Sequence, residues 1–297
     1  MTLVLDPAAL EGLLPHRGPN MLPDVVEVTG KCALSRTRIP VGDVRGREIF
    51  GRKTADGLFW NEPFLAELMA LTGIPLLTEG LAAKNQVAVF SMISKLIFHR
   101  PAPLGAMITG HAEVTRERSG FTTFLTRAEV DGLPLLEAEV MSGAATMAEI
   151  SNFPVRPFPT VPTGTPALAM SGKPAPLRFA DAVVKVDGST VIVAYTYPTD
   201  HPFVPGHFPG APLMMGVTQW SAVADAAWLA AKALGRTGKV VVSGGINRPD
   251  GSPVMDVRDL EIAVDDAGPA ILTTKRIAFR EAVRPGDGLL ITVTLQG

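Results

Sequence analysis

The sequence predicts an α+β protein with two domains, in each of which an antiparallel sheet wraps around one long helix. Three observations lead to this class. The chain has 297 residues, whereas single hydrophobic cores usually stop growing at about 250 to 300 residues. A proline-rich stretch at 153–176 separates two pieces of ordinary domain size. Both pieces show strands first, then a long apolar helix, and then further strands.

The first domain is expected to span residues 1–152. A strand-like region lies at 24–40, and apolar residues then recur at helical spacing from Pro63 to Ala83. Proline suits the first turn of a helix, where its missing N–H group costs no hydrogen bond. Alternating strands follow, and Asp131-Gly132 is a two-residue turn signal that predicts a hairpin.

The linker is expected at 153–176, because a proline every few residues favours extended, solvated backbone. The second domain then spans 177–297. Two strands joined by an Asp-Gly turn precede a helix over Leu213–Leu234. Four further strands follow that helix, with the sequences KVVVSGGI, DLEIAV, AILTTKRIAF and GLLITVTL.

The composition excludes several classes of partner. Charged residues make up 19% of the chain and the formal net charge is −2, so we expect no nucleic acid and no anionic membrane as partner. No apolar run approaches the roughly 20 residues that cross a bilayer, and no basic segment precedes an apolar stretch at the start. The single cysteine, Cys32, has no internal disulfide partner and no metal-ligand spacing around it. These features predict a soluble, cytoplasmic protein whose partners are small molecules or proteins.

One stretch resembles the signature of a known family. Residues 201–217, HPFVPGHFPGAPLMMGV, contain the run 207–210, His-Phe-Pro-Gly, and then Gly216 at the expected start of the second helix. This pattern resembles that of the 3-hydroxyacyl-acyl carrier protein dehydratases. LLPHRGPNML and EVDGLPLLEAEVM resemble the N-terminal stretch and the closing hairpin of the same family. The resemblance implies two fused hotdog domains, each a curved antiparallel sheet around a central helix, packed as an intramolecular pseudo-dimer.

The acidic residue of that family follows the histidine by fourteen positions, and here this position holds Ser221 (207 + 14). In the first half the equivalent helix position holds Glu67, and Lys53 stands fourteen residues before it. Each half therefore keeps one member of the pair and lacks the other. Because the family builds each site from two subunits, the resemblance implies one composite site formed by His207 and Glu67. The mirror-related pair, Lys53 and Ser221, is expected to be inert.

Three candidate residues suit the elimination of water from a 3-hydroxyacyl thioester. His207 is the candidate base for the C2 proton, since an imidazole is mostly neutral yet basic at working pH. Glu67 is the candidate acid, and burial among apolar neighbours raises a carboxyl pKa in the needed direction. Gly216, in the first turn of its helix, offers an unpaired amide to the thioester oxygen as negative charge develops on it. The sequence has no dinucleotide or phosphate loop and no clustered metal ligands, so no cofactor and no metal are expected.

Two further positions bear on this site. Leu71 stands where the family often has an amide residue that helps to hold the acid. His16 and Arg17, in the N-terminal stretch, are interpreted as structural rather than substrate-binding residues.

The second half also departs from the first in the spacing of its strands. The distance from Phe98 to Phe279 is 181 positions, whereas Glu67 and Ser221 are 154 positions apart, so the second half holds 27 extra residues (181 − 154). These residues resemble an Asp-Gly hairpin. Either the closing hairpin has been relocated along the chain or an ordinary hairpin has been inserted.

The predicted function is dehydration of 3-hydroxyacyl thioesters to trans-2-enoyl thioesters in fatty-acid, polyketide or related lipid biosynthesis. The substrate would be carried on acyl carrier protein or coenzyme A. Two alternatives remain: a non-catalytic acyl-binding or assembly module with the same fold, and a hotdog thioesterase. The acyl chain length, an accompanying isomerase activity and the pairing of chains as homodimers stay open.

Overall fold

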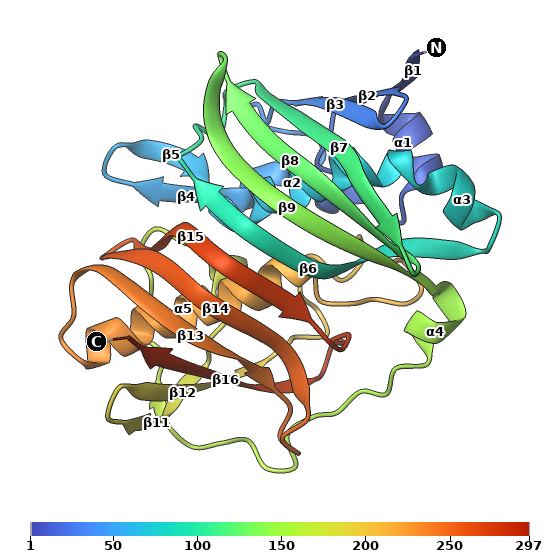
Figure 1. Cartoon of the computed structure of the whole chain (residues 1–297). Coiled ribbons are helices and arrows are strands. Elements are labelled where there is room, and N and C mark those ends of the chain that lie inside the picture. The colour runs from blue at the N-terminus through green and yellow to red at the C-terminus, as the bar shows by residue number, and fades with distance from the viewer. Residues whose placement is uncertain (1, 297) are drawn as a thin grey trace.

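In the computed structural model, which describes residues 2–296, fourteen strands form one sheet that curls around two long helices (Figure 1). The strand order is β1-β2-β3-β7-β8-β9-β6-β15-β14-β13-β16-β12-β11-β10, and all neighbours pair antiparallel. The two halves of the sheet join where β6 pairs with β15, for example at Met92 and Ala278. The long helices α2 and α5 each pack on the strands of their own half and also touch each other. The α+β class and the two hotdog units, packed as an intramolecular pseudo-dimer, are thereby confirmed.

The elements up to residue 152 belong to the first hotdog unit, which we call the N-terminal half. They are β1 Thr2–Leu5, α1 Pro7–Leu13, η1 Gly18–Asn20, β2 Val25–Thr29, β3 Cys32–Thr37, η2 Arg47–Phe50, β4 Gly51–Thr54, β5 Gly57–Trp60, α2 Glu62–Gly73, η3 Ile74–Leu76, α3 Thr78–Ala82, β6 Gln86–Phe98, β7 Ile108–Arg118, β8 Phe121–Val130, β9 Leu133–Thr146 and α4 Met147–Ser151. Strands β4 and β5 form a separate two-stranded sheet.

The later elements build the second unit, the C-terminal half. They are β10 Thr165–Pro166, η4 Ala175–Leu177, β11 Ala182–Asp187, β12 Thr190–Thr196, α5 Gly216–Ala233, β13 Gly238–Asn247, β14 Pro253–Asp265, β15 Gly268–Phe279 and β16 Gly288–Leu295. The domain boundaries at 152 and 176 stay a prediction.

The two central helices differ from the expected lengths at their ends. The first was predicted to run from Pro63 to Ala83, but α2 ends at Gly73, and the 3-10 helix η3 and the short helix α3 follow it. Pro75 explains the break, because its ring removes the N–H group that a continuing helix would use. The second was predicted over Leu213–Leu234, but α5 begins three residues later, at Gly216, and ends at Ala233. Gly235 adopts a φ of +66°, and the next N–H group reaches back to the Ala231 carbonyl at 2.8 Å, a common way to end a helix.

The sheet order decides between the two explanations of the extra hairpin. In the N-terminal half, the hairpin β8–β9 lies between β7 and β6. In the C-terminal half, the hairpin β13–β14 lies at the same place, between β16 and β15. The chain, however, makes β13–β14 before β15 and β16, whereas it makes β8–β9 after β6 and β7. The hairpin has therefore been relocated along the sequence and not inserted.

The predicted linker is only partly solvated. Most side chains of residues 154–169 are exposed, but Met170 and Lys173 are 1% and 2% exposed. Gly172 accepts a hydrogen bond from the Lys53 N–H group at 2.8 Å, and its own N–H group donates to the Ala267 carbonyl at 2.9 Å. Residues 170–173 thus form a strap between the hairpin β4–β5 of the N-terminal half and the turn between β14 and β15. The spacing of prolines in the sequence does not reveal the buried part of the linker, because prolines indicate a stiff, extended backbone and say nothing about burial.

Lys173 anchors the strap on α5. Its ammonium group pairs with Asp225 and lies 3.3 Å from the Ser221 hydroxyl. Replacing Lys173 by methionine is expected to lower the free energy of unfolding by about 3 kcal/mol, because the buried carboxyl group of Asp225 loses its partner. Urea denaturation followed by tryptophan fluorescence measures this change.

Lys185→Met is the matched control. Lys185 pairs with Asp187 at 2.9 Å, but both side chains are exposed, and exposed pairs of this kind contribute about 0 to 1 kcal/mol. Equal losses in the two variants would contradict the anchoring role of Lys173.

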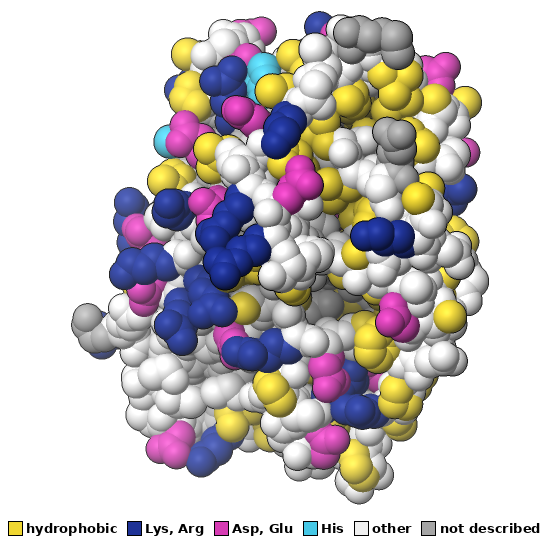
Figure 2. All heavy atoms as spheres, turned by 45° about the vertical axis from the view of Figure 1, so that its right-hand side comes forward, with side chains coloured by type: hydrophobic (Ala, Val, Ile, Leu, Met, Phe, Trp, Pro, Cys, Tyr) yellow, Lys and Arg dark blue, Asp and Glu magenta, His cyan; other side chains and the backbone are white. Residues whose placement is uncertain are grey.

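Among the described residues, no helix is both long enough and apolar enough to span a bilayer. On the face of the molecule in Figure 2, several Lys and Arg side chains gather together, and Asp and Glu side chains lie beside and around them. This mixture agrees with the small net charge of −2.

Candidate active site

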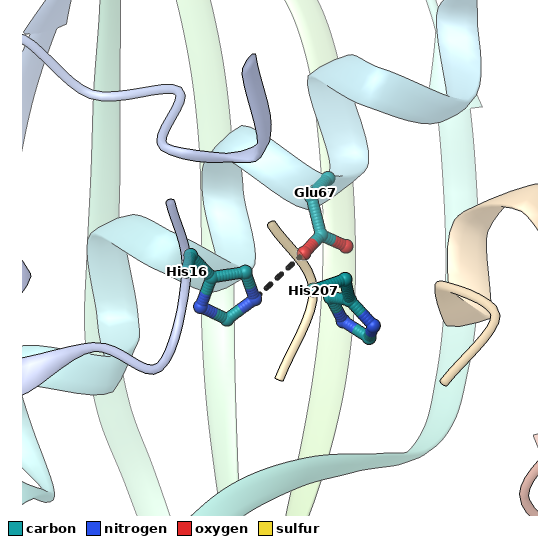
Figure 3. A group of neighbouring side chains, drawn as sticks. All are labelled: His16, Glu67 and His207. Carbon is teal, nitrogen blue, oxygen red and sulfur yellow. Dashed lines mark ion pairs between the residues drawn. The ribbon is translucent and has the colours of Figure 1, made fainter. Parts of the chain in front are cut away.

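Three buried side chains from separate parts of the chain meet at one point (Figure 3). Glu67 comes from α2, His207 from the turn before α5, and His16 from the loop after α1. Their ring nitrogens and carboxyl oxygens lie within 4.8 Å of one another. His207 is 6% exposed, and the other two side chains are 3% exposed. The two residues that the sequence pairs across the halves therefore lie together, and a third residue joins them.

Hydrogen bonds fix the position and the tautomer of His207. Its N–H group donates to the Phe203 carbonyl at 3.0 Å, and its ring nitrogen Nδ1 lies 2.9 Å from the Leu213 carbonyl. Because a carbonyl oxygen only accepts, Nδ1 carries the proton and Nε2 keeps a free lone pair. This neutral imidazole is in the form that a general base requires.

A short antiparallel bridge holds His16 against His207. Residues 15–17 of the N-terminal half pair with residues 206–208 of the C-terminal half through backbone hydrogen bonds of 2.8 and 3.2 Å. Gly206 permits this approach, since a Cβ atom there would collide with the Arg17 carbonyl oxygen. The contact between the two histidines is thus built into the backbone pairing of the two halves.

His16 also contacts the carboxyl group of Glu67. The distance between His16 Nε2 and Glu67 Oε1 is 3.6 Å. The interpretation of His16 as a structural residue misses this contact. Two signals in the sequence point to it: the histidine lies in a stretch that itself resembles the family, and Leu71 leaves Glu67 without the amide that the family often provides.

Burial sets the protonation states of the three groups. It raises the pKa of Glu67 to about 8 and lowers the pKa of His207 to about 4, which the hydrogen bond with Leu213 partly opposes. The pKa of His16 is well below its usual value, mainly because the ring is buried and to a smaller extent because His207 and Arg17 are nearby. At pH 7 Glu67 therefore carries a proton and both imidazoles are neutral. The site then holds one acid and two uncharged bases.

These side chains open onto a cavity of about 270 Å³ that both halves line. Its walls include Phe90 and Phe124 from the N-terminal half and Phe279 from the C-terminal half, so they suit an apolar chain. Gly216 also lines the cavity, and a Cβ atom there would lie 3.2 Å from the rings of Phe90 and Phe279. Its amide is in the first turn of α5, where backbone N–H groups have no acceptor within the helix.

The mirror-related pair, Lys53 and Ser221, is arranged differently from Glu67 and His207. Ser221 is fully buried and accepts the contact from Lys173, while the Lys53 side chain is exposed. The strap of residues 170–173 lies between them. The inertness of this pair stays a prediction. The buried ion pair of Lys173 and Asp225 lies beside Ser221.

His16, Glu67 and His207 form the one group of histidine, cysteine and acidic side chains in the described part of the chain that is close enough to hold a metal ion. Zinc accepts two neutral imidazoles and a carboxylate, and Glu67, whose pKa is about 8, would have to release its proton to become such a ligand.

No family model matches the sequence. It is 30% identical over 146 residues to the 3-hydroxyacyl-[acyl-carrier-protein] dehydratase FabZ of Actinobacillus succinogenes, in an alignment that covers 46% of this chain and 91% of the relative. The FabZ of Nitratiruptor is also 30% identical over 146 residues, which cover 46% of this chain and 95% of the relative. Among solved structures, the dehydratase heterocomplex ApeI:P from Xenorhabdus doucetiae aligns with 48% of this chain and 93% of its own, at 15% identity and a TM-score of 0.39.

Proposed function

The chain belongs to the 3-hydroxyacyl-[acyl-carrier-protein] dehydratase FabZ family, and we propose that it removes water from 3-hydroxyacyl thioesters at one composite site. The observation that carries this proposal is the meeting of a neutral His207 and a protonated Glu67, from different halves, at one apolar cavity. Dehydration needs a base and an acid at the same time, and these two groups are in those states at pH 7.

In the proposed reaction, Nε2 of His207 removes a proton from C2 of the acyl chain. The negative charge that develops on the thioester oxygen is stabilised by the Gly216 amide. Glu67 then donates its proton to the hydroxyl group on C3, the C3–O bond breaks, and a double bond forms between C2 and C3. Water leaves, and return of the proton from His207 to Glu67 restores both groups.

His16 takes the role of a positioning residue in this scheme. His16 Nε2 contacts Glu67 Oε1 (Figure 3), and we assign to this contact the role of holding the carboxyl group beside His207. The low pKa of His16 keeps it uncharged, so that it does not draw the proton from Glu67 at pH 7.

The family supports the proposed substrate class. Relatives named for the acyl carrier protein-linked reaction align over almost their whole length, and we propose the same carrier, or coenzyme A, for this chain. A module that only binds acyl chains would not need an acid and a base, the roles proposed for Glu67 and His207, in its cavity. We therefore prefer a cytoplasmic hydro-lyase of fatty-acid or related lipid biosynthesis to the two alternatives.

A product assay tests the proposal. The purified protein is given a short and a long 3-hydroxyacyl pantetheine thioester, and the reaction is followed by mass spectrometry. We expect loss of water with the thioester intact. Release of free thiol without loss of water would identify a thioesterase instead, and recovery of unchanged substrate would favour an acyl-binding module.

The pH dependence of kcat/KM is expected to fall above pH 8, because Glu67, with a pKa of about 8, loses the proton that it must donate. It is also expected to fall near pH 4, where His207 becomes protonated. Rates measured between about pH 5 and 10 cover the alkaline limb. A rate that still rises at the alkaline end would mean that the ionised form of Glu67 is the active one, contrary to this scheme.

A further inference from the structure

Gln219 is a polar residue inside the cavity that the mechanism above does not use. It lies on α5, is 4% exposed, and lines the same cavity as His207 and Glu67. Its Oε1 atom has no hydrogen-bond partner among the described residues. Its Nε2 atom has one contact, 3.4 Å from the Met214 carbonyl, which is long for such a bond.

Two other polar side chains of the cavity, those of Thr126 and Ser142, already have hydrogen-bond partners within the protein. The hydroxyl group of Thr126 donates to the Ala138 carbonyl at 3.1 Å, and that of Ser142 lies 3.1 and 3.2 Å from two backbone carbonyls. These groups have no need of a ligand. A buried amide oxygen without a donor is unfavourable, so Gln219 differs from them in offering an acceptor that a bound molecule can fill.

The position of Gln219 on α5 suggests which substrate atom it meets. Gly216 and Gln219 are three residues apart and therefore share a face of the helix, about 4.5 Å apart along its axis. If the thioester oxygen lies at the Gly216 amide, the C3 hydroxyl group is two carbons further along the acyl chain. This spacing brings the hydroxyl group to the amide of Gln219.

We propose that Gln219 binds the substrate by accepting a hydrogen bond from its 3-hydroxyl group. The proposal rests on the proposed function and extends it to the recognition of the leaving group. Glu67 must donate a proton to the lone pair of that hydroxyl oxygen, and the hydroxyl's own proton needs an acceptor that turns it away from Glu67. Gln219 provides this acceptor. The enoyl product lacks the hydroxyl group, so the same residue favours substrate over product.

The test measures binding on a variant that does not turn over. In a His207→Ala background, isothermal calorimetry gives Kd for a 3-hydroxyacyl pantetheine thioester and for the saturated thioester of equal length. We expect the hydroxylated ligand to bind about tenfold more tightly, which matches one hydrogen bond of about 1.4 kcal/mol. In the His207→Ala/Gln219→Leu variant this preference should fall about fivefold or more, and the contact of Glu67 with the hydroxyl group accounts for any preference that remains.

His207→Ala/Ser142→Ala is the matched control, because Ser142 lines the same cavity but has its hydrogen bonds within the protein. It should keep the preference for the hydroxylated ligand. A preference that Gln219→Leu leaves undiminished would overturn the proposal. Equal binding of the two ligands to the His207→Ala protein, or no detectable binding of either, would also overturn it.

Two measurements distinguish this proposal from a purely structural role of Gln219 and from the proposed function. Gln219→Leu removes an unsatisfied buried group, so its thermal midpoint should not fall, and a drop of several degrees would show that the amide serves the fold instead. Turnover of the wild-type protein is assayed separately. Failure there contradicts the proposed function, whereas the ratio of the two Kd values tests Gln219 without any turnover.

Discussion

Replacing His207 by alanine is expected to lower kcat for dehydration of a 3-hydroxyacyl thioester by about 100-fold or more, because the C2 proton then has no positioned base. The effect should be on kcat more than on KM, since the apolar walls of the cavity still hold the acyl chain. Enoyl product quantified by mass spectrometry measures the rate. The variant should remain folded, because a smaller side chain replaces an imidazole that is uncharged at neutral pH.

His99→Ala is the control for this experiment. His99 lies 3.5 Å from Glu137 but does not line the cavity, so its loss should leave kcat unchanged. If His207→Ala kept most of the wild-type rate, the composite site would be wrong.

Replacing Glu67 by glutamine is expected to reduce kcat by about 100-fold or more, because an amide cannot donate the proton that the leaving hydroxyl group requires. This variant tests the claim that the two halves share one site, since Glu67 belongs to the N-terminal half and His207 to the C-terminal half. Glu129→Gln is a matched control: Glu129 also lies 3.5 Å from a histidine, His111, but outside the cavity. Equal rates for Glu67→Gln and wild type would remove Glu67 from the mechanism.

Stability measurements on Glu67→Gln check that lost activity is not lost folding. Burial raises the pKa of Glu67 from 4.5 to about 8, so between these values the folded protein holds a proton that the unfolded chain has released. Wild-type stability therefore falls as pH rises through this window. The Glu67→Gln variant has no such group. Its stability relative to wild type should rise from pH 5 to pH 8, and an unchanged difference would contradict the raised pKa.

The sequence predicts the main helices and strands of this molecule well, because the spacing of apolar residues recurs along each of them. The two long helices, the strands around them and the pairing of His207 with Glu67 follow from apolar spacing and from the resemblance of residues 201–217 to a family signature. The end of α2 at Gly73 is predictable from Pro75, but the apolar pattern continues past it and conceals the break.

The parts that the sequence does not reveal depend on contacts between distant segments. Lys173 lies in a proline-rich stretch typical of solvated linkers, and only the fold brings it to Asp225. His16 precedes Glu67 by 51 positions (67 − 16) and reaches it through a backbone bridge to the other half. Gln219 is one polar residue in an apolar helix, and its unfilled hydrogen-bonding capacity is visible only from its surroundings.

The relocated hairpin changes the order in which ribosomal synthesis can complete the two halves. The N-terminal half has all its main strands once β9, ending at Thr146, has emerged. In the C-terminal half, β16 pairs with both β12 and β13 and is made last, so the sheet stays divided until residues 288–295 have emerged. Until then α5 and the segment bearing His207 lack part of their support, and nascent chains expose apolar surface that aggregation or chaperones can engage. The N-terminal half can therefore complete its main strands before the C-terminal half has been made, whereas the C-terminal half cannot join β12 to β13 until β16 has been made.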